Sequence, residues 1–252
     1  MLRVENVTHR YQVGEVVVEA LRDVNLEVRK SEFFTIIGPS GCGKSTLLNI
    51  IAGLIRPTAG RVFVNGTEVT RPLPGMMAYV FQQPLLLPWR TVLDNVAFGL
   101  EMMGVEKRER IKRAKEMLQL VGLQGFEKMY PSELSGGMQQ RVSIARALAV
   151  NPSILLMDEP FGALDEQTRL QLGIELTKIW MLTKKTIVFV THSLSEAALL
   201  SDRIAVMCAR PGRVIDVLEV DADRPRDPES PEVQRVRSRL WDLLRNAAKV
   251  TA

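Results

Sequence analysis

Cysteine and histidine are scarce in this chain, and long apolar runs are missing. Two cysteines and two histidines in 252 residues are too few for a disulfide framework or a zinc site, so a reducing compartment is expected. No apolar run approaches the roughly 20 residues that cross a bilayer. Residues 1–6 lack the apolar core of a signal peptide. We therefore expect any role at a membrane to depend on a partner.

A strong charge of one sign is also missing. The 33 Lys and Arg residues nearly balance the 29 Asp and Glu residues, which gives a net charge of +4. The charges are interspersed, and the chain has no basic block or basic stripe interleaved with aromatics. Nucleic acid is therefore not expected as a partner. The apolar fraction of 46% and the charged fraction of 25% are those of an ordinary globular protein.

One glycine-rich stretch is the most informative feature that is present. It follows an apolar run at 33–37 and precedes a predicted helix at 47–54, and it matches the phosphate-binding pattern G-x-x-x-x-G-K-[ST] at Gly38, Pro39, Ser40, Gly41, Cys42, Gly43, Lys44, Ser45 and Thr46. The glycines let backbone N–H groups point inward at phosphate oxygens, and the helix start adds a positive dipole end. Lys44 is expected to reach the β- and γ-phosphates, and the Ser45 hydroxyl to join a Mg²⁺ shell. The chain is predicted to bind a nucleoside triphosphate with Mg²⁺.

The first part of the chain is rich in strand patterns. Residues 1–30 alternate apolar and polar side chains, as half-buried strands do. A further strand at 61–67 runs into an Asn-Gly turn. Residues 84–150 are predicted to be mostly helical, with helices over 91–103 and 107–121 and a third opening near Ser135.

Strands and helices alternate after residue 150, which indicates a parallel sheet covered by helices. The predicted strands lie at 153–157, 186–190, 203–207 and 213–220. A Pro- and charge-rich linker follows at 221–231, and then a helix with one apolar face made of Val233, Val236, Leu240, Leu243, Leu244 and Ala247. This helix could dock a partner, but covering the domain surface is the favoured interpretation.

Two acids follow one of these strands directly. Asp158 and Glu159 come after the apolar residues 154–157. At the carboxyl end of a parallel strand, the first is placed to hold Mg²⁺, directly or through water, and the second to orient or deprotonate an attacking water. A solvated acidic turn is the alternative. His192 ends the strand at 186–191, and we expect it to contact the γ-phosphate, although a solitary histidine is more often structural.

A second candidate anion site begins at Ser135. Ser135 is a good helix N-cap, and Gly136 and Gly137 expose N–H groups at the start of the helix. In isolation this pattern could be no more than a helix start.

Taken together, these motifs resemble the ATP-binding subunit of an ABC transporter, over nearly all of residues 1–215. Residues 38–46 are similar to its Walker A loop, 134–138 to its signature and 155–159 to its Walker B strand. The remaining matches are Gln82 as the Q-loop glutamine, which serves both metal and catalysis, residues 162–165 as the D-loop with Asp165, His192 as the switch histidine and Tyr11 as the aromatic that stacks on adenine.

The resemblance implies an α/β fold: a P-loop NTPase parallel-sheet core, an N-terminal antiparallel β subdomain and an α-helical signature subdomain. The ATPase domain would cover 1–220, with the helical subdomain at about 84–150, and 221–252 would be linker and C-terminal helix. The cofactors implied are ATP and Mg²⁺. Glu159 would polarise the attacking water while Lys44 and Mg²⁺ stabilise the developing charge.

The resemblance also implies partners. Two copies would form a head-to-tail dimer in which the Walker A loop of one and the signature of the other enclose each ATP. The subunit would lie peripherally on the cytoplasmic face of the cell membrane, bound to an integral membrane permease. A periplasmic or extracellular substrate-binding protein would act with it indirectly.

Three departures from the family pattern stand out. Met138 replaces the usual signature glutamine, and Ser193 follows the histidine where many relatives carry aspartate. Gln82 is followed by Gln83, so the Q-loop assignment depends on alignment to Phe81.

The apolar run at 84–92 is expected to lie at the surface and face the permease, although packing against its own helical subdomain is an alternative. Its Leu-Pro-Trp sequence and residues 209–214 resemble importers of nitrate, sulfonates and taurine. The rival hypotheses are a lipid- or lipoprotein-handling ABC system, a soluble ABC protein of DNA repair or translation, and a scaffold without hydrolysis. The last is disfavoured by the intact Asp158, Glu159 and His192.

Overall fold

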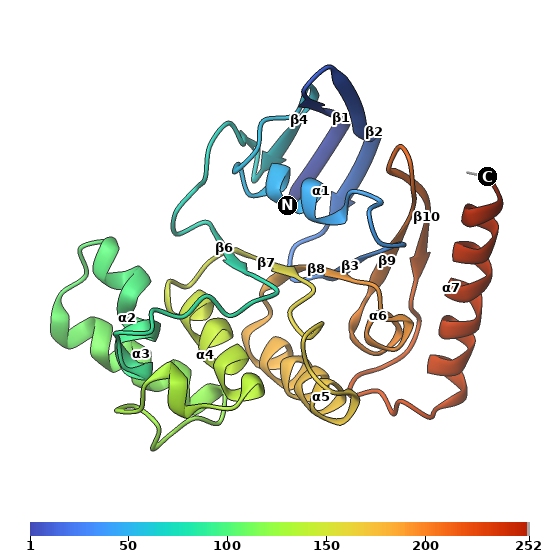
Figure 1. Ribbon diagram of the computed structural model, residues 1–252. Helices are drawn as coiled ribbons and strands as arrows, with labels where there is room; N and C mark the ends of the chain where they lie inside the picture. The colour runs from blue at the N-terminus through green and yellow to red at the C-terminus, as the bar shows by residue number, and fades with distance from the viewer. Residues whose placement is uncertain (251–252) are drawn as a thin grey trace. The chain divides into compact units, whose positions relative to one another are not determined.

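The structure is a computed structural model that describes residues 1–250. The chain folds into two compact units, whose elements are labelled in Figure 1. The first unit contains residues 1–73 and the chain from residue 184 on, and the second contains Pro74–Thr183. Thr251 and Ala252, the end of the predicted C-terminal segment, lie outside the described residues.

An antiparallel sheet in the order β2-β1-β4-β5 forms one layer of the first unit. Its strands are β1 (Leu2–Val13), β2 (Val16–Val28), β4 (Ala59–Val64) and β5 (Thr67–Glu68). Leu2 pairs with Val28 on one side and Val64 on the other. The turn between β4 and β5 has positive φ at Asn65 and Gly66, 51° and 81°, as a tight hairpin turn requires. The predicted alternation and the Asn-Gly turn are both confirmed.

The second layer of the first unit is a run of parallel strands around β3 (Phe33–Ile37). β3 lies between β8 (Thr186–Thr191) and β9 (Arg203–Cys208) and is parallel to both. β10 (Arg213–Glu219) is the edge strand of the sheet and pairs antiparallel with β9. Every residue of β3 is buried, which explains why its sequence is a continuous apolar run.

The helix after the glycine-rich loop begins and ends earlier than predicted. α1 covers Lys44–Ile51, whereas the sequence suggested 47–54. It stops because Gly53 turns the chain with a φ of +74°, close against the backbone of Arg71, whose carbonyl carbon lies 2.4 Å from a Cβ built on Gly53. At its other end, the helix begins with Lys44, which is also the lysine of the glycine-rich loop.

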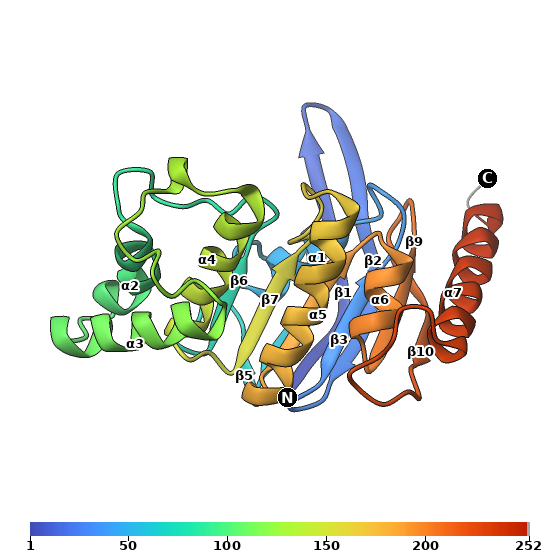
Figure 2. The ribbon, with the colours of Figure 1, turned by 90° about the horizontal axis from the view of Figure 1, so that it is seen from below.

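Two further helices cover the first unit, α6 (Leu194–Leu200) and α7 (Pro231–Val250). Figure 2 shows α7 running beside α6 and β10. Val233, Leu240 and Ala247 are buried, and Leu240 packs in a cluster with Ile204 of β9. The predicted amphipathic helix is confirmed over the described residues, with its apolar face turned to the domain.

The second unit combines a pair of parallel strands with helices. Its strands are β6 (Met77–Val80) and β7 (Ile154–Asp158), and its helices are α2 (Val92–Met102), α3 (Lys107–Leu120), α4 (Gly136–Ala149) and α5 (Glu166–Thr183). The three helices predicted after residue 84 are confirmed. β6 is an addition that the sequence analysis missed, because four residues next to Gly75 carry no readable period.

Candidate nucleotide-binding site

The glycine-rich loop has the backbone conformation of an anion-binding nest. Gly41 and Gly43 both adopt left-handed backbone angles, with φ of 75° and 93°, and the Cys42 N–H bonds back to the Pro39 carbonyl at 3.3 Å. Gly43 is the N-cap residue of α1, so the unpaired N–H groups of the first turn open onto the loop. A loop followed by a helix N-terminus in this form suits phosphate oxygens.

The surroundings of Gly43 leave no room for a side chain. A Cβ on Gly43 would lie 2.6 Å from Leu21 Cδ2 and 2.9 Å from the Ala20 carbonyl oxygen. Gly212, in the turn between β9 and β10, approaches still more closely, since its Cβ would lie 2.1 Å from the Cys42 carbonyl oxygen. The Gly212 N–H also donates to the Ala20 carbonyl at 3.0 Å. Two backbone segments that are distant in the sequence, at Ala20 and at Gly212, thus pack closely against the loop.

Lys44 is held within the loop that it follows. Its ammonium group donates to the carbonyl oxygens of Gly38 at 2.9 Å and Pro39 at 3.2 Å, and the residue is 5% exposed. Ser45, next along the helix, is exposed. Cys42 is fully buried, so its thiol is not accessible to a ligand.

Tyr11 lies beside the first turn of α1. Its hydroxyl shares a hydrogen bond of 3.2 Å with the Thr46 hydroxyl, and the residue is 37% exposed. The buried His9 packs edge-on against this ring, with centroids 4.5 Å apart. The structure therefore brings the predicted adenine-stacking aromatic to the phosphate loop.

His192 lies at the same sheet edge as the loop. β8 and β3 pair with Thr191 opposite Ile37, so the residues that follow each strand, His192 and Gly38, leave the sheet at the same edge. His192 is exposed. This edge, at the carboxyl ends of parallel strands, is where ligands bind in open α/β sheets.

The structure explains the serine after His192. The Ser193 hydroxyl is the N-cap of α6 and accepts a hydrogen bond from the Glu196 N–H at 3.3 Å. Serine and aspartate are both strong N-cap residues. At this departure from the family pattern the chain therefore still carries a residue suited to the N-cap.

The acidic pair of the second unit is set on a strained turn. β7 ends at Asp158, and Glu159 has a left-handed φ of 43°. The Gly162 N–H closes the turn by donating to the Glu159 carbonyl at 3.0 Å. Positive φ in a non-glycine residue is uncommon, and the role of Glu159 in orienting water stays a prediction.

Asp158 has a hydrogen-bond donor that the sequence did not reveal. The Tyr79 hydroxyl of β6 donates to Asp158 Oδ2 at 3.2 Å. Burial, with the nearby carboxylate charge, raises the pKa of Tyr79, so the phenol keeps its proton. The missed strand β6 is the reason why no sequence signal pointed to this contact.

Gln82 lies at the same turn as the acids. A Cβ on Gly162 would be 3.2 Å from Gln82 Nε2 and 3.3 Å from the Glu159 carbonyl oxygen. Just before it, the Phe81 carbonyl accepts a hydrogen bond from Gln140 of α4 at 3.4 Å. This placement favours Gln82 over its neighbour Gln83 as the Q-loop glutamine.

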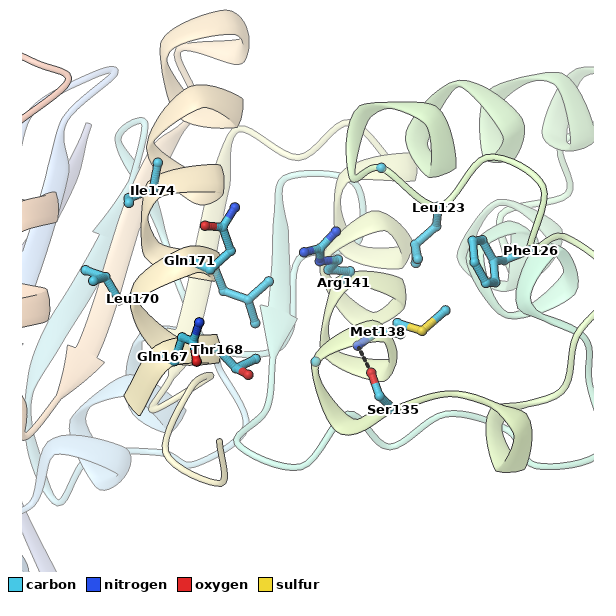
Figure 3. A pocket seen from close by; sticks show the side chains of 13 residues that line it. Leu123, Phe126, Ser135, Met138, Arg141, Gln167, Thr168, Leu170, Gln171 and Ile174 are labelled. Atoms are coloured by element: carbon cyan, nitrogen blue, oxygen red, sulfur yellow. Dashed lines mark hydrogen bonds between the residues drawn. The ribbon is translucent and has the colours of Figure 1, made fainter. Parts of the chain in front are cut away.

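The predicted signature end of α4 has the expected cap. The Ser135 hydroxyl accepts from the Met138 N–H at 3.3 Å, as Figure 3 shows. A groove of about 510 Å³ runs between this helix end and α5, and Met138 lines it. Gly137 stands close to α5, since its Cβ would lie 3.0 Å from Thr168 Cγ2.

Asp165 directly precedes α5 and caps its first turn. Its carboxylate accepts from the Thr168 N–H at 2.9 Å. This backbone hydrogen bond, with one from the Thr168 side chain, lowers the pKa of Asp165. The exposed Asp165 is therefore oriented by the helix that it caps.

The apolar segment 84–89 is held by polar side chains of its own unit. Arg146 of α4 donates to the carbonyls of Pro84 at 2.7 Å and Leu85 at 2.8 Å. Asn95 of α2, fully buried, bonds both the N–H and the carbonyl of Leu87. The side chains of Leu85 and Trp89 are nonetheless 54% and 72% exposed. The backbone is thus fixed from inside while apolar side chains face outward.

The donor groups fit the two cofactors expected from the sequence. The left-handed backbone at Gly41 and Gly43 and the free N–H end of α1 that follows them suit a phosphate. The Ser45 hydroxyl in the first unit, and the Asp158 carboxylate and the Gln82 amide in the second, each carry an oxygen of the kind that Mg²⁺ prefers. Among residues 1–250, no helix is long and apolar enough to span a membrane.

A buried parallel strand, followed by a glycine nest and then by a helix that begins at a lysine, defines a P-loop nucleoside triphosphatase. A family model described as ABC transporter matches residues 21–162. The chain is 54% identical over 245 residues to an uncharacterized ABC transporter ATP-binding protein of Methanocaldococcus jannaschii, covering 97% of this chain and 91% of that protein. It is 45% identical over 223 residues to the aliphatic sulfonates import ATP-binding protein SsuB of Bacillus anthracis, covering 88% and 87%.

A solved ATP-binding cassette, described as a dimer in a post-hydrolysis state bound to ADP and Pi, superimposes with a TM-score of 0.77 at 38% identity. The match covers 88% of this chain and all of that one. The chain belongs to the ABC transporter ATP-binding family and is an ABC-type ATPase. The predicted α/β fold, with its antiparallel N-terminal sheet, is confirmed. The roles of the individual site residues stay predictions.

Proposed function

We propose that this chain is the ATP-hydrolysing subunit of an importer for a small anion such as nitrate, a sulfonate or taurine, with a separate membrane permease. The observation that carries the ATPase part is the nest at Gly41 and Gly43 leading into Lys44. The sulfonate-import relatives support the cargo class. The exposed Leu-Pro-Trp segment supports the importer assignment by its likeness to the same group.

Each site residue has a proposed part in the reaction. Lys44 and the loop hold the phosphates, and Tyr11 stacks on adenine. Asp158, Ser45 and Gln82 hold Mg²⁺, which when bound supplies neutralising charge at the phosphates. Glu159 orients the attacking water, and His192 contacts the γ-phosphate.

The working form that we propose is a head-to-tail dimer of two copies. The support is that the chain has two helix N-termini suited to phosphate, at Lys44 and at Gly136, and that the solved relatives are described as dimers. Ser135, Gly136 and Gly137 of one copy would then meet the nucleotide held by the loop of the other. Asp165 would lie at the same interface.

The location and the other partners follow from this assignment. We place the subunit on the cytoplasmic face of the cell membrane, with segment 84–89 against the permease and a substrate-binding protein outside the membrane acting indirectly. Exposure of Leu85 and Trp89 supports that docking. We further propose the division into an ATPase domain over 1–220, with a helical subdomain at about 84–150, and a C-terminal segment over 221–252.

The test of this proposal is Glu159→Gln in the full chain. We expect ATP binding to persist, hydrolysis to fall at least about a hundredfold because the water is no longer oriented, and ATP to induce a stable dimer on size-exclusion chromatography. Adding Ser135→Arg to this variant should return the protein to a monomer. Glu116→Gln, on the exposed surface of α3, is the matched control and should hydrolyse ATP normally.

Undiminished turnover in Glu159→Gln would remove this residue from catalysis, and a dimer that survives Ser135→Arg would rule out the head-to-tail arrangement. The cargo is tested separately. A strain lacking this gene should fail to grow on a particular anion as sole nitrogen or sulfur source, and normal growth on nitrate, sulfonates and taurine would exclude that cargo class.

A further inference from the structure

We propose that Tyr79 is a positioning residue for Asp158, holding its carboxylate in the orientation in which it receives the divalent cation. The direct observation is the hydrogen bond of 3.2 Å from the Tyr79 hydroxyl to Asp158 Oδ2. The inference rests on the proposed function, since it assumes that Asp158 binds Mg²⁺. It adds a residue that none of the sequence motifs includes.

The strand register explains how the hydroxyl reaches this carboxylate. β6 and β7 are parallel neighbours, and Tyr79 is opposite Leu156. A tyrosine is long enough to extend along the neighbouring strand to its end, two residues further on, where Asp158 lies. The donor and the acceptor therefore come from two strands that fix each other through main-chain pairing.

The Tyr79 ring is itself immobilised. It stacks on Phe81 with ring centroids 4.3 Å apart and planes at 27°, and the residue is partly buried. A ring fixed on one face leaves its hydroxyl little freedom to swing. The hydrogen bond is therefore preorganised by packing and not only by the carboxylate's attraction.

Such a donor matters because a carboxylate at a strand end has rotational freedom about its side-chain bonds. A hydroxyl that donates to one carboxylate oxygen selects a rotamer and constrains how the second oxygen is presented. Groups that orient metal ligands typically change metal affinity about 10–100-fold when they are removed. Since the Tyr79 hydroxyl is a neutral donor, we expect the lower end, about tenfold.

The experiment measures Mn²⁺ binding by electron paramagnetic resonance, with ATP present, in the full chain carrying Glu159→Gln to prevent turnover. Adding Tyr79→Phe should weaken Mn²⁺ binding about tenfold while the affinity for ATP without metal changes less than about twofold. The phenylalanine keeps the stacking on Phe81. Circular dichroism and thermal melting of the same samples establish that the variant is folded.

Thr177→Val is the matched control. It removes another hydroxyl hydrogen bond from the same unit, the bond of 3.0 Å to the Gly173 carbonyl, far along α5 from the acids. If Thr177→Val weakens Mn²⁺ binding as much as Tyr79→Phe does, the effect is one of general stability and the proposal fails.

Asp158→Asn separates this proposal from the function on which it rests. If Asp158→Asn weakens Mn²⁺ binding strongly and Tyr79→Phe leaves it unchanged, the positioning role is overturned and the metal site stands. If neither variant changes Mn²⁺ binding, the metal-binding role of Asp158 is wrong and the role of Tyr79 is overturned with it.

Discussion

The two units of this protein support their predicted functional residues in different ways. In the first unit the main chain itself shapes the phosphate loop. Gly41 and Gly43 set its curvature, and Gly212 packs closely against the backbone of Cys42. In the second unit, side chains hold the functional segments. Tyr79 bonds Asp158, and Arg146 bonds the carbonyls of Pro84 and Leu85.

This difference predicts two kinds of sensitivity to mutation. A main-chain nest fails when a new Cβ clashes with neighbouring backbone, because backbone atoms have nowhere to move in a packed interior. When a side chain that bonds such a segment is removed, the protein loses stability because the segment's backbone groups are left unsatisfied, but the segment keeps its backbone path. The following predictions test that contrast.

The largest effect is expected from a methyl group in the loop. Gly43→Ala combines a strained φ with contacts of 2.6 Å and 2.9 Å to Leu21 and Ala20. Strain of about 1–3 kcal/mol and overpacking of a similar size should reduce ATP affinity on the order of a hundredfold or more, measured by isothermal titration calorimetry.

Gly41→Ala is the matched control for this prediction. Gly41 also has positive φ, but a Cβ there would meet nothing within 4 Å. We expect a smaller loss, of about tenfold, since only the backbone strain of about 1–2 kcal/mol remains. Equal losses in the two variants would show that the crowding at Gly43 is unimportant.

An intermediate effect is expected in the second unit. Asn95→Ala removes the buried amide that bonds both backbone groups of Leu87 and also donates to the Arg90 and Thr91 carbonyls. Leaving such groups unsatisfied should lower the free energy of unfolding by about 2 kcal/mol. Unfolding in urea is measured by the fluorescence emission of Trp180, which is buried in the same unit.

ATP affinity of Asn95→Ala should stay within about twofold of the unmodified chain, because the nest is made without this residue. Gln124→Ala, at an exposed position, is the control and should not change stability. If Asn95→Ala unfolds at the same urea concentration as the unmodified chain, the clamp on segment 84–89 is not a stabilising feature.

The smallest effect concerns pH and the buried His9 behind Tyr11. Burial lowers the pKa of His9, against a smaller opposing contribution from a backbone hydrogen bond of Arg56. When the pH falls below about 6.5, the usual pKa of histidine, His9 binds a proton in the unfolded chain. In the folded chain His9 takes up this proton only at a lower pH. Stability from this group is therefore present above pH 6.5 and is lost as the pH falls.

His9→Asn removes this titration, so its melting temperature should fall less than that of the unmodified chain between pH 7.5 and 5.5. Differential scanning calorimetry at matched ionic strength measures the difference. Parallel curves for the two proteins would mean that His9 does not titrate differently in the folded and unfolded states.

Much of the fold could be read from periodicity, but short elements could not. β3 and β8 were predictable because continuous apolar runs mark buried parallel strands. β6 was missed, since four residues cannot carry a period, and with it the contact to Asp158. A polar Asn95 within the apolar face of α2 was a signal that could have led to the clamp on Leu87.

The sequence alone determined the features whose cause is local. A glycine pattern sets the curvature of its own loop, Ser135 caps the helix that follows it, and a strand followed at once by Asp158 and Glu159 puts both acids at its end. In these cases the residues that specify the conformation lie within a few positions of the residues that adopt it.

Only the tertiary structure decided which distant groups support those features. The packing of Gly212 on Cys42 and the bond from Tyr79 to Asp158, 79 residues away, depend on strand pairing, and no local pattern encodes strand order. The physical reason is that propensity and periodicity act over a few residues. Close packing and hydrogen-bond satisfaction act between whatever residues the fold brings together.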